Sequence, residues 1–213
     1  MEKGNVDNSA TLVSAVTDLF LSAKNLPPIA SIWMGGAKTV YGIVAEIKER
    51  TFNKKLEDFL RQTGKTSDKD RLKFIQRLGE DKKEFWERIL LLLEKINEEE
   101  KAEITGRICH ALILEYLSVD DFFRLALIIE RTYLFDIQFL HSRFLSRITD
   151  AKRQQTDMIE FESTDEAEPL IANLVTAGLL EQQRTGILQH ANLNSVVGVN
   201  PTRLGKLLLK IWI

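Results

Sequence analysis

Cysteine and histidine are the residues in this chain with the greatest potential for catalysis or metal binding, and they are few. Cys109 and His110 are adjacent, so on a helix their side chains diverge by about 100° and cannot pair as nucleophile and base. Cys109 also follows Ile108 within a periodic apolar pattern, which favours a buried structural thiol. His141 and His190 have no partner at the spacings typical of metal ligands. We therefore expect no metal centre.

Other catalytic and ligand-binding motifs are also missing from the sequence. Gly35 and Gly36 are not followed by the Gly-Lys-Ser/Thr of a phosphate-binding loop, and no Gly-x-Ser-x-Gly occurs. The acidic residues 98–100 lack the alternating oxygen ligands and central glycine of a calcium loop, and they suit the start of a helix. The sequence thus predicts a protein that is not an enzyme, with no cofactor and no identifiable small-molecule substrate.

Composition places the chain among globular proteins. Its 213 residues are 44% apolar and 28% charged, enough for a real core in one domain with or without a small appendage. The net charge of −2 gives no reason to expect a nucleic-acid partner. One cysteine excludes an internal disulfide and suits a reducing cytoplasm, and the N-terminus does not resemble a secretory signal. No apolar run reaches the roughly 18 residues of a conventional membrane span.

The rest of the chain is organised around an apolar segment, residues 10–47, that is nearly without charge, whereas about half of residues 48–104 are charged. Apolar residues at helical spacing predict a first helix that Pro27 and Pro28 end. A second helix then carries Trp33 and Val40, with small residues that permit close packing. We expect an apolar helical hairpin, which could be core, a self-association face or a membrane-inserting element.

Repeated helix-start signals predict a bundle of about six helices through residue 150. Ser67 with Asp70, Asp81, Asn97 with Glu100, and Ser118 with Asp121 are the expected caps. We expect the longest helix in "VDDFFRLALIIERTYLFDIQFLHSRFLSRI", which has more large apolar residues than one face can hold. This helix is therefore central to the bundle or contacts another chain. The candidate interaction surface comprises Trp33, Gly35, Gly36, Val40, Phe122, Phe135 and Phe139.

Residues 151–168 form a polar stretch that we interpret as a connector between residues 1–150 and a small tail, residues 169–213. The tail begins with a short helix that Gly178 ends. Two short strands follow in "LLEQQRTGILQHANLNSVVGV", around a turn that contains Gly and Asn. A closing helix, "NPTRLGKLLLKIWI", completes the chain.

The tail, with a helix, "AGLLE", a β-wing and "TRLGKLLLKI", resembles the second half of a winged-helix domain. In that family the helix before "GLL" reads the major groove of DNA. Here that helix offers only Asn173 for the purpose, with Glu166 and Glu168 before it. The resemblance therefore implies packing or protein binding rather than DNA reading. The body, with "FNKKLEDFL", "LLLLEKINEEEKAEITGR" and "LSVDDFFRLALIIERTYL", resembles small bacterial proteins that join an apolar hairpin to a charged helical bundle.

Together these features predict a mainly α protein, a multi-helix bundle with an apolar N-terminal hairpin and a small winged-helix-like α+β tail. We expect a non-enzymatic interaction or regulatory protein that self-associates or binds a protein partner. One alternative is a membrane-acting protein that inserts residues 10–47, and a second is a DNA-binding regulator that uses the tail. The expected location is the bacterial cytoplasm, or the surface of the inner membrane under the membrane alternative.

Overall fold

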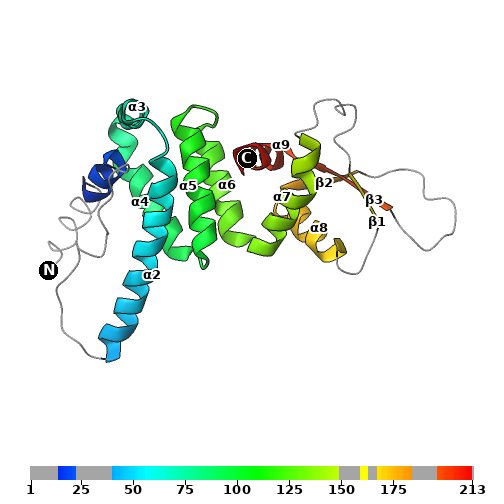
Figure 1. Ribbon diagram of the computed structural model, residues 1–213, viewed down its shortest axis with the longest axis horizontal. Coiled ribbons are helices and arrows are strands. Elements are labelled where there is room, and N and C mark those ends of the chain that lie inside the picture. Colours follow the sequence, from blue (N-terminus) through cyan, green and yellow to red (C-terminus); the bar gives the residue numbers. More distant parts are fainter. Residues whose placement is uncertain (1–13, 23–39, 149–158, 163–166, 184–195, 213) are drawn as a thin grey trace. The chain divides into compact units, whose positions relative to one another are not determined.

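The computed structural model describes residues 14–22, 40–148, 159–162, 167–183 and 196–212, which are mainly helical with one small antiparallel sheet (Figure 1). The chain divides into two compact units, unit 1 (Met1–Phe122) and unit 2 (Phe123–Ile213). Their boundary falls within helix α6 (Val119–Arg131). The connector expected at residues 151–168 lies further along the chain, and most of it is outside the described residues.

Unit 1 is helical throughout its described part. A short helix over residues 14–21 precedes the labelled elements. These are α2 (Val40–Thr63), α3 (Asp68–Leu78), the 3-10 turn η3 (Gly79–Asp81), α4 (Lys82–Lys95) and α5 (Glu99–Ile113). Helix α5 lies alongside α2 (Figure 1).

Several of the expected helix ends are confirmed. The Asp70 backbone N–H donates to Ser67 Oγ over 3.1 Å at the start of α3, and Ser118 Oγ accepts the corresponding bond from Asp121 at the start of α6. Gly79, with φ 55°, follows the last residue of α3. The cap expected at Asn97 is wrong, because Glu98 is the residue that precedes the first turn of α5. Asp81 does precede α4, but its side chain makes no capping bond.

One helix continues past the apolar segment, and the helix expected to be longest is divided. Helix α2 runs for 24 residues across the change from apolar to charged sequence, because no glycine or proline after Gly42 interrupts its hydrogen bonds. The helix expected to be longest is instead divided into α6 and α7 (Leu134–Ile148). The Thr132 N–H closes the last turn of α6, and Tyr133 O accepts the first bonds of α7. This division lets α6 and α7 bury apolar residues in different directions, which one straight helix could not do.

Aromatic side chains form much of the core of unit 1. Phe20, Trp86 and Phe122 are each 0% exposed. The ring of Phe20 lies 4.9 Å from that of Trp86, and Phe85 lies 5.8 Å from Phe122, measured between centroids. The short helix over residues 14–21 is therefore part of this core. The remainder of the predicted hairpin between residues 23 and 39 lies outside the described residues.

Unit 2 combines helices with a three-stranded antiparallel sheet. After α7 the chain forms β1 (Ile159–Glu162), α8 (Ala167–Thr176), β2 (Leu180–Gln183), β3 (Val196–Pro201) and α9 (Arg203–Trp212). The strand order is β1-β3-β2, with Ile159 opposite Val199 and Leu180 opposite Pro201. The two strands expected in the tail are thus confirmed. Strand β1 was not expected, because its four residues lie within the polar stretch interpreted as a connector.

Within unit 2, α7 packs against α8 and α9, and these two helices contact β2 and β3 respectively (Figure 1). Gly178 has φ 76° and ends α8 as expected, since a left-handed residue is the common helix stop. Thr202 begins α9 by accepting a bond at Oγ1 from the Gly205 N–H over 3.1 Å. The imidazole of His141 on α7 stacks on the Trp212 indole of α9, with ring centroids 4.7 Å apart. Helices α7 and α8 also contact each other, and both contribute residues to the lining of a cavity.

Candidate functional site

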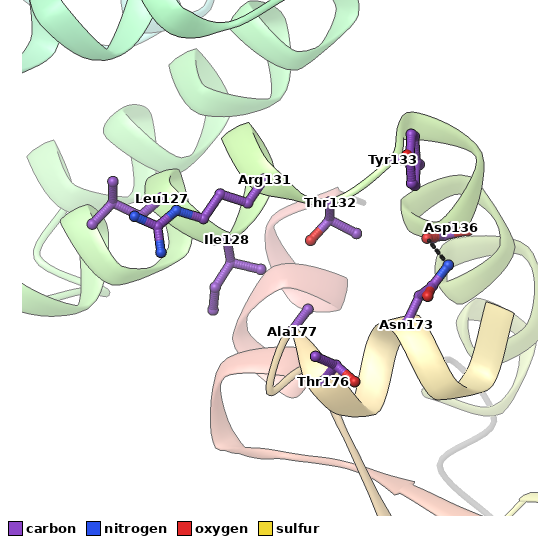
Figure 2. A pocket seen from close by; sticks show the side chains of 9 residues that line it. All are labelled: Leu127, Ile128, Arg131, Thr132, Tyr133, Asp136, Asn173, Thr176 and Ala177. Atoms are coloured by element: carbon purple, nitrogen blue, oxygen red, sulfur yellow. Dashed lines mark hydrogen bonds between the residues drawn. The ribbon is translucent and has the colours of Figure 1, made fainter. Parts of the chain in front are cut away.

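A cavity of about 430 Å³ opens at the corner where α6 turns into α7, within unit 2 (Figure 2). The last turn of α6, the first turn of α7 and the C-terminal half of α8 contribute to its walls. Its apolar wall residues are Leu127, Ile128 and Ala177. Its polar ones are Arg131, Thr132, Tyr133, Asp136, Asn173 and Thr176. Apolar walls with a few polar groups are typical of ligand sites.

Asp136 supplies a buried negative charge to this cavity. The residue is 2% exposed, and its Oδ2 accepts a hydrogen bond from Asn173 Nδ2 over 3.1 Å. Its position in the first turn of α7 is favourable for a carboxylate, because the helix dipole is positive there. Within the described part of the chain, Asn173 is the one hydrogen-bond donor to the Asp136 side chain. The carboxylate therefore retains capacity to accept from a ligand.

Arg131 supplies the opposite charge. Its side chain is 77% exposed, and its Nε lies 3.6 Å from Oε2 of Glu130. The Glu130 side chain is 22% exposed, but a single contact from an arginine that is mostly in solvent contributes little free energy, so the guanidinium can exchange Glu130 for another anion. Figure 2 shows Arg131 on the opposite side of the cavity from Asp136 and Asn173.

The candidate surface residues expected from the sequence do not form one cluster. Trp33, Gly35 and Gly36 lie outside the described residues, and Val40 is the first residue of α2, with its side chain outside the description. Phe122 is 0% exposed. Its assignment to an interaction surface is therefore corrected: its ring packs near Phe85 in the core of unit 1, because α6 turns this face inward.

The other two candidates are on α7 in unit 2. Phe135 is 66% exposed, which leaves most of a large apolar ring in solvent. Phe139, one turn later, is half-buried, and the guanidinium carbon of Arg143 lies 5.6 Å from its ring centroid. A cation over an aromatic face contributes a modest stabilising interaction. Among the candidates whose side chains the structure describes, Phe135 is thus the one that remains largely available to a partner.

Cys109 and His110 are placed as the sequence suggests. Cys109 is 0% exposed, and burial raises the pKa of its thiol far above the usual range, so the reactive thiolate is disfavoured. The expectation of a buried structural thiol is confirmed. Burial also lowers the pKa of His110, and the positive charge of Lys65 lowers it further. Among the described residues, His, Cys, Asp and Glu form no group of three suited to a metal ion.

The residues that define the cavity were not found by sequence reasoning. Asp136 and Asn173 are separated by 37 positions along the chain, and neither belongs to a motif that predicts the contact. The sequence showed Leu127, Thr132 and Tyr133 only as parts of a continuous helix. One signal in the sequence could have revealed the corner. The expected long helix carries more large apolar residues than one straight helix can bury, so the chain has to change direction within it.

Comparison with known protein families, with curated proteins and with solved structures gave no match. Among the described helices, none combines the length and apolar character needed to cross a bilayer. The surface and the cavity of this chain are therefore the features that bear on its function.

Proposed function

We propose that this protein is a non-enzymatic interaction protein that self-associates through an apolar corner of unit 2. The corner comprises Leu127, Tyr133 and Phe135, which are 42%, 71% and 66% exposed. The three residues flank a single change of chain direction, and Leu127 and Tyr133 also share the wall of the cavity. The exposure of three large apolar side chains on this short stretch of chain is the observation that carries the proposal, because exposed apolar surface marks interaction sites.

The exposed large apolar residues in the described part of unit 1 provide a contrast. Leu72 lies on α3, Leu91 on α4 and Tyr116 after α5. Single exposed apolar residues on separate elements are ordinary for a protein surface. The corner of unit 2 differs because the exposed aromatic residues Tyr133 and Phe135 lie on one short stretch of chain, and aromatic residues are enriched in interface cores.

A second copy of the chain is the partner we favour. With a net charge of −2, two copies experience little long-range repulsion, and a low net charge promotes association. A symmetric pair would also bury each apolar corner against an identical surface, as isologous dimers do.

Sedimentation velocity at increasing protein concentration tests this proposal. We expect a reversible dimer, and Phe135→Ser should weaken it by about 2 kcal/mol, as loss of an aromatic anchor does. Leu91→Ser, which changes a similarly exposed apolar residue of unit 1, is the matched control and should leave dimerisation unchanged. A wild-type chain that stays monomeric at high micromolar concentration, or a dimer insensitive to Phe135→Ser, would refute the proposal.

We also infer that the C-terminal part of unit 2 is a winged-helix-like element used for packing rather than for reading DNA. The order β1-β3-β2, with α8 before β2 and α9 after β3, supports the likeness. Asn173, the candidate base-reading residue, donates its amide to Asp136, and Glu168 is exposed on the same helix. We expect no salt-sensitive affinity for duplex DNA. Tight, salt-dependent binding that Arg203→Ala abolishes would favour the DNA-binding alternative instead.

The membrane alternative has less support than self-association. It depends on residues 10–47, and of these Val16 and Phe20 are 2% and 0% exposed. Inserting this part of the segment into lipid would require its removal from the aromatic core of unit 1. Liposome flotation of the full chain tests the alternative directly, because an inserting protein would float with the vesicles.

A further inference from the structure

The cavity of unit 2 carries groups of opposite charge on two sides. Asp136 and Asn173 form one side, and Arg131 lies on the other (Figure 2). Leu127, Ile128 and Ala177 contribute apolar surface to the wall. The volume of about 430 Å³ lies within the range of roughly 300–1,000 Å³ that small-molecule sites occupy.

The Asp136 side is built to receive a cation. A carboxylate on a residue that is 2% exposed, as Asp136 is, needs hydrogen bonds or a positive partner to offset the loss of water. Asn173 supplies a single neutral hydrogen-bond donor, and the N-terminus of α7 supplies a partial positive charge from the helix dipole. No lysine or arginine of the described chain forms an ion pair with Asp136. An ammonium or guanidinium group from a ligand would supply that missing charge.

The Arg131 side is suited to an anion. Arginine recognises carboxylates through paired, directional N–H donors, and the exposed contact to Glu130 at 3.6 Å is weak competition. Between the charged sides, the apolar wall suits an aliphatic segment. The hydroxyl groups of Thr132 and Thr176 are further polar groups in the wall.

We propose that this cavity binds a small zwitterion with an aliphatic spacer, an amino-acid-like ligand whose cationic nitrogen contacts Asp136 and whose carboxylate contacts Arg131. This site goes beyond self-association and does not depend on it. Recognition of both charges distinguishes this ligand from a simple amine or a simple carboxylate, since each of these would leave one side of the cavity without a partner.

Isothermal titration calorimetry of the full chain with matched probes tests the assignment. The probes are L-lysine and 6-aminohexanoate, which have both charges, hexylamine, which lacks the carboxylate, and hexanoate, which lacks the amine. At least one of the two zwitterions should bind, and each single-charge probe should bind at least about tenfold more weakly, because a hydrogen bond to a charged group is lost.

Substitutions test which residue of the cavity contacts each charged group of the ligand. Asp136→Asn keeps the shape and an acceptor for Asn173 but removes the charge, so it should weaken the bound zwitterion by about tenfold or more. Arg131→Gln changes a side chain that is 77% exposed, and it should give a loss of similar size. Arg124→Gln, an exposed arginine on α6 outside the cavity wall, is the control and should leave binding unchanged.

Circular dichroism and thermal melting of each variant separate loss of the site from loss of the fold. If Asp136→Asn fails to fold, Arg131→Gln with the four probes still tests the proposal. Absence of binding by both zwitterions at millimolar concentration would overturn the assignment. Equal binding of hexylamine, or full binding by folded Arg131→Gln, would overturn it as well.

Discussion

The side chain of Phe20 lies edge-on to the indole ring of Trp86, with their ring centroids 4.9 Å apart. Both residues are 0% exposed, and Phe20 also lies 6.0 Å from the ring of Phe74. The described part of the apolar N-terminal segment therefore shares a core with α3 and α4. Any model in which residues 14–21 leave the protein must include the loss of this aromatic packing.

Phe20→Ala tests the importance of that packing. We expect the free energy of unfolding to fall by about 3–5 kcal/mol, because the substitution removes a large buried ring and leaves a cavity. Chemical denaturation followed by circular dichroism measures the change. Leu19→Ala, at a half-buried neighbouring position, should have a smaller effect. A Phe20→Ala protein as stable as the wild type would show that the short helix is dispensable for unit 1.

Arg71 joins the same short helix to the turn between α2 and α3. Its guanidinium is 0% exposed and donates to the carbonyl oxygens of Leu21 (3.3 Å) and Thr66 (2.8 Å). Arg71→Lys keeps the charge but loses the planar fork, so buried acceptors are left without donors. We expect a loss of about 2–3 kcal/mol in the free energy of unfolding. The matched control, Arg88→Lys at a half-exposed position, should change stability by about 0.5 kcal/mol or less.

Gly106 allows α5 to approach α2 closely. A Cβ at this position would lie 2.6 Å from the carbonyl oxygen of Phe59, a backbone atom that cannot move aside easily. Alanine normally favours a helix over glycine by about 1 kcal/mol, but overpacking costs about 1–3 kcal/mol or more. We expect the cost of the clash to exceed the gain in helix propensity, so that Gly106→Ala lowers the denaturation midpoint. A raised midpoint would show that the two helices separate without cost.

Gly205 provides the corresponding test in unit 2. A Cβ there would lie closer still to a backbone atom, the carbonyl oxygen of Leu179. Gly205→Ala should therefore destabilise the start of α9 and the end of β3. Tryptophan fluorescence can follow this change through Trp212, since Trp212 lies on α9. An unchanged melting curve for this variant would contradict the close approach.

His110 makes the stability of the fold depend on pH. Burial and the charge of Lys65 lower its pKa, while a hydrogen bond with the Gln62 backbone acts in the opposite direction. The unfolded chain therefore binds a proton more readily than the folded chain below about pH 6.5, the ordinary pKa of histidine. Stability should be unaffected by His110 above that pH and should fall as pH is lowered.

Urea denaturation of the wild type and of His110→Gln between pH 7.5 and 5.5 measures this contribution. The wild type should lose more stability over this interval than the variant. Other titrating groups are common to both proteins, so the difference isolates His110. Equal losses in the two proteins would show that the folded environment leaves this histidine unperturbed.

The sequence by itself determined the helical class, many helix ends and the buried state of Cys109. These features depend on local causes. Ser67 and Ser118 can cap a helix through bonds to residues three positions away, Gly178 accepts a left-handed conformation, and apolar periodicity identifies inward-facing residues. The strands β2 and β3 fall within the stretch in which two short strands were expected from the sequence.

The tertiary structure alone decided which candidates became surface, core or site. Phe122 and Phe135 both looked like interaction residues on one helix, but the turn at Thr132 and Tyr133 separated their environments and left Phe135 exposed. The same turn brought Asp136 next to Asn173 from a distant part of the chain. Sequence periodicity records which residues avoid water, but it carries no information about the direction in which the next helix runs. That direction depends on packing among distant segments, and it created the cavity.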